Sequence, residues 1–188
     1  MRKIFWCTAL ALSLLAGAGC KKKDERLQRS EKAVEKTTED LKDQRKELDE
    51  AQQDLNRERN KPGDEPRDME KKEAEVRAQE SDVTAAEGAQ LRAKEDFVRA
   101  AKDHLGVIDA RIRDLETRAD AGAKSFAAQL REERNALAAK VDRVDVRAAA
   151  GWDDFKKDIN DSFQKLDKDV DAAMHGEKAP AERPLPNK

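Results

Sequence analysis

Tyrosine is absent from this chain, and aromatic residues make up only 4% of its 188 residues. A globular enzyme of this length normally builds its core from aromatic and large aliphatic side chains, so the composition argues against one. Glycine and proline are also few, at 8 and 5 residues, which argues against a loop-rich or all-β fold. Because 39 Lys and Arg residues nearly balance 41 Asp and Glu residues, no basic excess points to nucleic acid.

Charged residues, in contrast, make up 43% of the chain. A composition this charged and this poor in aromatics is typical either of disorder or of long solvated helices. Hydrophobic periodicity distinguishes the two, and it favours helices over most of the chain.

The first residues have the pattern of an export signal. Arg2 and Lys3 are followed by an uncharged run from Ile4 to Ala16. A helix of these 13 residues would be about 20 Å long. The hydrocarbon core of a bilayer is about 30 Å thick, so the run indicates a signal peptide over residues 1–19 and not a membrane span.

The small residues Gly17-Ala18-Gly19 precede Cys20, and this stretch resembles the lipobox of bacterial lipoproteins. The resemblance implies a diacylglyceryl thioether on Cys20, cleavage before it, and acylation of the new amine with a fatty acid such as palmitate. Ordinary cleavage after Ala18 is the alternative, and it would leave one free thiol. An exposed thiol is a liability in an oxidising compartment, which favours lipidation. Cys7 lies in the signal, so we expect no disulfide.

Residues 20–23 then form a lipidated basic tether. In the enterobacterial sorting pattern, Asp after the cysteine retains a lipoprotein at the inner membrane. Lys21 stands there instead, which resembles an outer-membrane destination facing the periplasm. The three lysines of the tether either lie on anionic headgroups or are simply solvated.

Residues 24–95 are predicted to form a thin helical hairpin, interrupted around Pro62 and Pro66. Its first helix has one apolar row with a spacing of seven residues, typical of a coiled coil. The row consists of Leu27, Val34, Leu41, Leu48 and Leu55. The second row of the seam is largely polar, and the sequence leaves open whether it begins at Ser30 or at Glu31. This weak seam also leaves self-association open.

Residues 96–175 are predicted to form a second hairpin with a third helix packed on it. From Ala101 onward its first apolar row alternates between spacings of four and three residues, as an interhelical seam requires, and a second row repeats this pattern with an interruption at Arg134. The rows are Phe97, Ala101, Leu105, Ile108, Ile112, Leu115 and Ala119, then Phe126, Leu130, Leu137, Val141, Val144 and Ala148. A break at Ala121-Gly122-Ala123 separates the two helices. Residues 176–188, with three prolines, are predicted to be a disordered tail.

The third helix, Trp152 to Met174, has the clearest amphipathic pattern in the chain. Its apolar stripe is a candidate partner-binding face, made of Trp152, Phe155, Ile159, Phe163, Leu166 and Val170. Its polar face holds seven Asp and four Lys residues, which disfavours binding to anionic lipid. Packing of this stripe onto the preceding helices is the simpler interpretation, because such stripes usually mark a core face.

Catalytic and metal-binding motifs are missing from the sequence. His104 and His175 stand alone, and no zinc, nucleotide or nucleophile motif is present. We therefore expect no catalytic residues, no metal, no cofactor and no small-molecule substrate.

Lys188 ends the chain, and with a lipidated cysteine and heptads it weakly resembles the murein-linked outer-membrane lipoproteins. Residues Pro184 to Asn187 differ from the tail of that family, so we do not expect attachment to peptidoglycan.

These patterns together predict an all-α, elongated protein of antiparallel helical hairpins, anchored in the bacterial cell envelope through Cys20. The expected role is structural or adaptor-like and not enzymatic, with an envelope protein or a second copy as its partner. The alternative is a protein that binds lipids or amphiphiles through its amphipathic helices.

Overall fold

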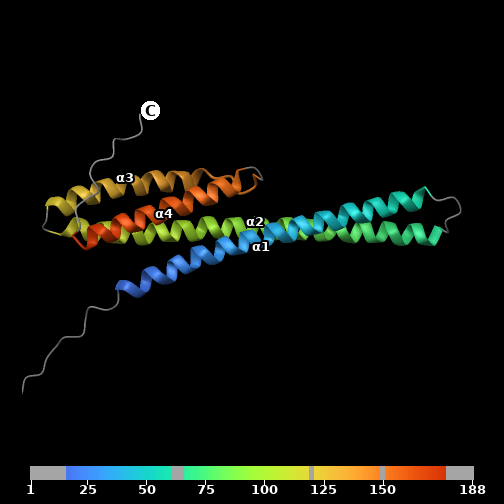
Figure 1. The fold of residues 1–188 in the computed structure, drawn as a ribbon, viewed down its shortest axis with the longest axis horizontal. Coiled ribbons are helices and arrows are strands. Elements are labelled where there is room, and N and C mark those ends of the chain that lie inside the picture. Colours follow the sequence, from blue (N-terminus) through green and yellow to red (C-terminus); the bar gives the residue numbers. More distant parts are fainter. Residues whose placement is uncertain (1–15, 61–65, 119–120, 149–150, 177–188) are drawn as a thin grey trace, which may run out of the picture.

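The protein is built of four long helices, as a computed structural model shows (Figure 1). The helices are α1 (Ala16–Arg59), α2 (Pro66–Thr117), α3 (Ala121–Arg143) and α4 (Trp152–Met174). The structure describes residues 16–60, 66–118, 121–148 and 151–176, with side chains from Glu25 onward except that of Ala121. No strand occurs in these ranges, so the predicted all-α class is confirmed.

The helix ends differ from the sequence prediction at several places. Helix α1 begins at Ala16, inside the predicted signal, and it includes residues 20–23, which the sequence assigned to a tether before the first helix. Helix α2 begins at Pro66, which the sequence assigned to the interruption between two helices, because a proline is tolerated in the first turn of a helix. Gly122 lies in the first turn of α3 and not in a break before it. Helix α3 ends at Arg143, short of the predicted Ala148, because the Asp145 side chain accepts a 2.9 Å hydrogen bond from the Arg147 amide and forms a turn.

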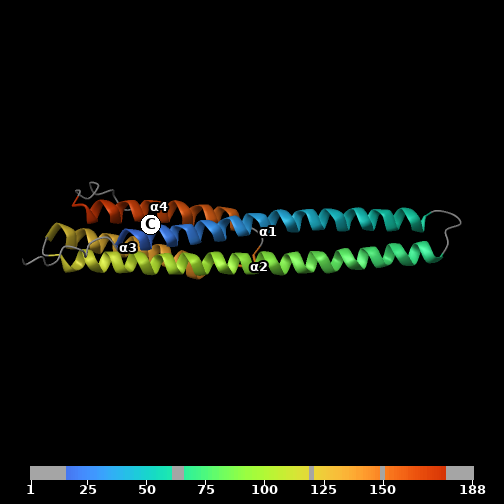
Figure 2. The same ribbon diagram turned by 90° about the horizontal axis from the view of Figure 1, so that it is seen from below.

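Helices α1 and α2 pack side by side in opposite directions along most of their length (Figures 1 and 2). Ion pairs cross the pair at both ends and in the middle: Arg26–Asp103, Arg45–Glu87 and Arg59–Glu73. The seven-residue row of α1 faces α2. The second row is the one that begins at Ser30, because Thr37 and Gln44 are half-buried whereas Thr38 and Arg45 are exposed. The α1 seam therefore has its partner within the same chain.

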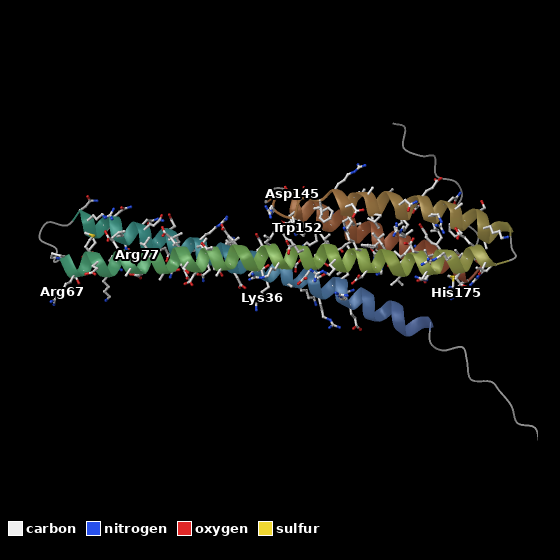
Figure 3. The ribbon with its side chains drawn as sticks, turned by 180° about the vertical axis from the view of Figure 1, so that it is seen from behind. Lys36, Arg67, Arg77, Asp145, Trp152 and His175 are labelled. Carbon is white, nitrogen blue, oxygen red and sulfur yellow. The ribbon has the colours of Figure 1, made fainter. Side chains whose placement is uncertain are left out.

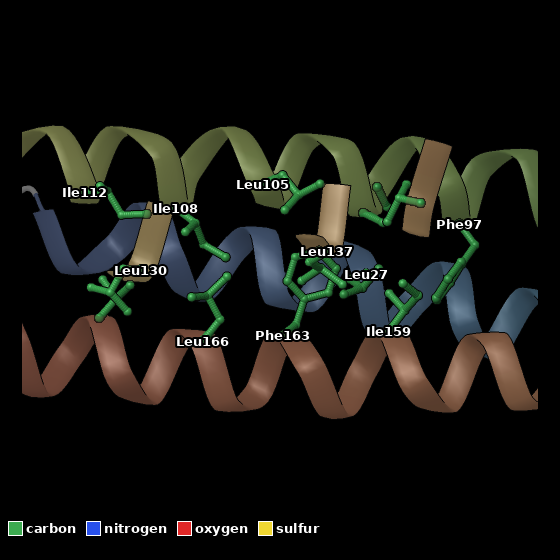
Figure 4. Packing of buried hydrophobic residues seen from close by; sticks show 14 of the residues in the cluster. Leu27, Phe97, Leu105, Ile108, Ile112, Leu130, Leu137, Ile159, Phe163 and Leu166 are labelled. Carbon is green, nitrogen blue, oxygen red and sulfur yellow. The ribbon is translucent and has the colours of Figure 1, made fainter. Parts of the chain in front are cut away.

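Helices α3 and α4 cover one half of the α1–α2 pair and form a four-helix bundle with it (Figure 2). One apolar cluster joins all four helices, and it includes Leu27 and Val34 of α1 (Figure 4). The sequence placed a boundary between two hairpins at residues 95 and 96. The structure differs, because α2 continues unbroken through that point and is shared by both units.

The other half of the α1–α2 pair extends beyond the bundle as a two-helix arm, residues 41–59 and 66–90. Its own buried cluster is small: Ala51, Leu55 and Val76, with Leu48 and Met69 packed against it. The 52 residues of α2 correspond to about 78 Å at about 1.5 Å per residue, so the molecule is a rod.

Candidate functional site

The apolar stripe of α4, which the sequence offered as a partner-binding face, lies inside the bundle. Ile159 and Val170 are completely buried, and Phe155 is half-buried against the same cluster. The interpretation as an exposed docking surface is therefore corrected for this conformation, and the stripe is the core face of α4. Apolar rows on α2 and α3 provide enough area to cover it, and the sequence of α4 alone could not show this. The buried members are Trp152, Ile159, Phe163, Leu166 and Val170.

An aromatic cluster closes the bundle where the arm begins (Figure 3). The Trp152 ring lies edge-on to Phe97, with 6.0 Å between their centroids, and 5.3 Å from Phe155. The Lys94 ammonium lies 5.0 Å from the Trp152 ring centroid and donates a 3.2 Å hydrogen bond to the Ala148 carbonyl. Gly151 precedes α4 with φ of 79°, a conformation that glycine adopts without strain. The cluster thus holds the α3–α4 connection against α2.

Burial of Lys94 leads to a prediction about pH. Desolvation lowers the pKa of Lys94 below 10.5, although the nearby Asp153 and Asp145 carboxylates favour its charged form. The folded state therefore releases this proton at lower pH than the unfolded state does. As a result, this group increases the free energy of unfolding as the pH rises from the lowered pKa to about 10.5.

A Lys94→Met variant lacks this contribution. The stability of the natural protein relative to the variant should therefore increase between pH 7 and pH 10.5. Urea unfolding followed by circular dichroism at both pH values measures the difference. If the free energy of unfolding changes equally in the natural protein and in Lys94→Met between these pH values, the lowered pKa of Lys94 is contradicted.

A second polar network joins α2 to α4, and sequence reasoning missed it. His104 is 2% exposed, its Nε2 lies 2.7 Å from Asp167 Oδ2, and its ring packs edge-on against Phe163. Arg111 pairs with both Asp167 and Asp171. Residues 104 and 111 are seven positions apart and residues 167 and 171 are four apart, so each pair lies on one side of its helix. The sequence did not show, however, that α2 and α4 face each other.

A groove of about 560 Å³ separates α1 from α4 beside this network. Leu27 and Phe163 contribute apolar surface to it, and Glu31, Asp161 and Asp167 contribute negative charge. Direct links between the two helices are polar: Asn160 donates to Glu31, and Lys156 pairs with Glu35. The α1–α4 side therefore combines these polar links with apolar residues of the shared cluster.

Cys20, the predicted lipidation site, falls in the first turns of α1, and its side chain lies outside the described part of the chain. The rest of the predicted signal before Ala16 and the tail after Gly176 also lie outside it. Figures 1 and 2 place the start of α1 at the bundle end of the rod, opposite the tip of the arm.

Comparison of the chain with protein-family models, with curated proteins and with solved structures gave no match. None of the described helices has a stretch long and apolar enough to cross a bilayer. Within the same residues, no three His, Cys, Asp or Glu side chains are grouped so that they could hold a metal ion.

Proposed function

We propose that this chain is a non-enzymatic lipoprotein of the bacterial cell envelope, anchored through Cys20 and acting as a rigid spacer or adaptor in the periplasm. The sequence around Cys20 supports the anchor, and Lys21 supports an outer-membrane destination. The partner of the rod is another envelope protein or a second copy of the chain.

The observation that supports this role best is the position of the anchor relative to the arm. Cys20 lies at one end of α1 and Arg59 at the other, 39 residue steps along one helix. At about 1.5 Å per step, these residues are about 59 Å apart. A lipid on Cys20 would therefore hold the bundle near the membrane and direct the arm away from it.

The surface of the rod is consistent with a role in water and not within a bilayer. Every Leu, Ile, Val, Met, Phe and Trp side chain in the described part is buried or half-buried. Charged side chains cover the outside instead (Figure 3). Attachment to a membrane would then depend on the acyl chains, each contributing about 0.8 kcal/mol per buried CH₂.

Metabolic labelling with an alkynyl palmitate tests the anchor directly. We expect the natural chain to be labelled and to fractionate with membranes, and a Cys20→Ala variant to lose the label completely. A Cys7→Ala variant is the matched control, because it removes the other cysteine of the chain and should keep the label. Mass spectrometry of the mature N-terminus should find an acylated Cys20.

An unmodified thiol, or a mature chain that begins at Gly19, would contradict this proposal. Equal labelling of the Cys20→Ala and natural chains would do the same, because the acyl chain would then be elsewhere.

The second candidate is a protein that binds lipids or amphiphiles, and the α1–α4 groove is the observation that favours it. Release of α4 on the side of this groove would expose the stripe that contains Phe163 and Leu166. Flotation with phosphatidylcholine vesicles, using a chain that begins at residue 20 and carries Cys20→Ala, separates the two candidates. Binding without the anchor supports the second, and absence of binding supports the first.

A further inference from the structure

Arg134 interrupts the apolar row of α3, and the structure shows where this arginine lies. Its Nη2 atom is 2.6 Å from Asp109 Oδ2 on α2, and its Nη1 donates to Asn135 Oδ1 at 3.3 Å. The guanidinium therefore lies over the seam between α2 and α3, and the whole Arg134 side chain is 22% exposed.

Two more arginines surround it and form a small basic pocket of about 220 Å³. This equals the liquid volume of about seven water molecules at about 30 Å³ each, which is enough for a phosphate group and a few waters. Three guanidinium groups and the Asp109 carboxylate line the pocket, and Glu116 pairs with Arg131 beside it, so one positive charge is left uncompensated. The lining residues are Asp109, Arg113, Arg131, Arg134 and Asn135.

Two of these arginines keep hydrogen-bond donors that the fold does not use. Arg131 is engaged with Glu116 through Nε at 3.0 Å and Nη2 at 2.8 Å. The Nε of Arg134, however, is buried and has no hydrogen-bond partner. Arg113 is exposed and makes no ion pair with the residues that the structure describes. A buried donor without an acceptor is costly, so an acceptor oxygen in this pocket would stabilise it.

We propose that this pocket binds a phosphate group, held by the free guanidinium of Arg113 and the Nε–H of Arg134. Several oxygens on a tetrahedral dianion can accept from donors on two helices at once, and guanidinium groups match phosphate geometry. The group is either a soluble phosphate or the headgroup of a phospholipid. This inference does not depend on lipidation of Cys20, because it uses only contacts between α2 and α3.

The test follows the Arg134 Nε–H signal by ¹⁵N NMR while inorganic phosphate is added at constant ionic strength with chloride. The protein begins at residue 20 and carries Cys20→Ala, which retains every residue of both apolar clusters. We expect a saturable shift of this signal. An Arg113→Gln variant should weaken binding about tenfold, because it removes a charge-assisted contact.

Arg92→Gln is the matched control. Arg92 is exposed on the same helix, three heptads before Arg113, and its replacement causes the same change in net charge. Phosphate affinity should stay within about twofold in this variant, because only long-range screened electrostatics would change.

Vesicles identify the source of the phosphate group. Flotation is compared between vesicles of phosphatidylcholine alone and vesicles that also contain phosphatidic acid. If the protein binds the vesicles with phosphatidic acid, and this binding requires Arg113 but not Arg92, the ligand is a lipid headgroup. If it binds inorganic phosphate but does not float with these vesicles, the ligand is soluble. The proposal is overturned if the Arg134 signal does not shift saturably, or if Arg92→Gln weakens phosphate binding as much as Arg113→Gln does.

Discussion

An Ile108→Asp variant is expected to lose the four-helix bundle at room temperature. Ile108 is completely buried in the cluster that joins all four helices (Figure 4). Loss of the buried aliphatic side chain costs about 2–5 kcal/mol, and a buried carboxylate without a partner adds several more. Since the whole stability of a domain is only about 5–15 kcal/mol, the bundle should not survive this change.

Circular dichroism at 222 nm, recorded as the sample is heated, measures the effect. We expect low helicity and no cooperative melting in Ile108→Asp. The control is Ala110→Asp, which introduces the same carboxylate on the exposed side of α2 and should cost less than about 1 kcal/mol. Natural helicity and an unchanged melting temperature in Ile108→Asp would show that this seam does not hold the bundle together.

A Trp152→Ala variant is expected to destabilise the protein by about 3–5 kcal/mol. Trp152 is 5% exposed and contacts Phe97, Phe155 and the Lys94 ammonium, so truncation would leave a cavity at the start of α4. Loss of these contacts should also loosen the α3–α4 connection, because the cluster holds it against α2.

Trp152→Phe separates packing from hydrogen bonding at the same position. The indole Nε1 is buried without a hydrogen-bond partner, so its removal leaves no acceptor unsatisfied. Phenylalanine keeps much of the aromatic contact, and we expect a cost below about 1.5 kcal/mol. Urea unfolding of both variants gives the two values. If Trp152→Ala loses no more stability than the small amount expected for Trp152→Phe, the cluster contributes little through packing.

Much of the fold could be predicted from the sequence. The limits of α4 were predicted closely, because its apolar stripe is regular and Gly151 precedes it. Phe97, Leu105 and Leu130 were assigned to apolar seams and are buried. Periodicity predicts which residues are buried, because the apolar side of a helix is the side that any partner helix covers.

The candidate site was less predictable. The stripe of α4 was recognised and its packing onto the preceding helices was favoured, but the pattern did not show which helices cover it. His104 and Arg134 were visible only as a lone histidine and as an interruption of an apolar row. Their partners, Asp167 and Asp109, are on other helices. A distant partner leaves no local signal in the sequence when charged residues are this frequent.

The sequence by itself determined the helical class and which side of each helix is apolar. Tertiary structure alone decided that the bundle and the arm share α2, that Ser30 and not Glu31 begins the second α1 row, and that α2 and α3 cover the stripe of α4. The physical reason is that apolar contact has no directional preference. Periodicity therefore says which side is buried, while complementary shape and charge between whole helices select what buries it.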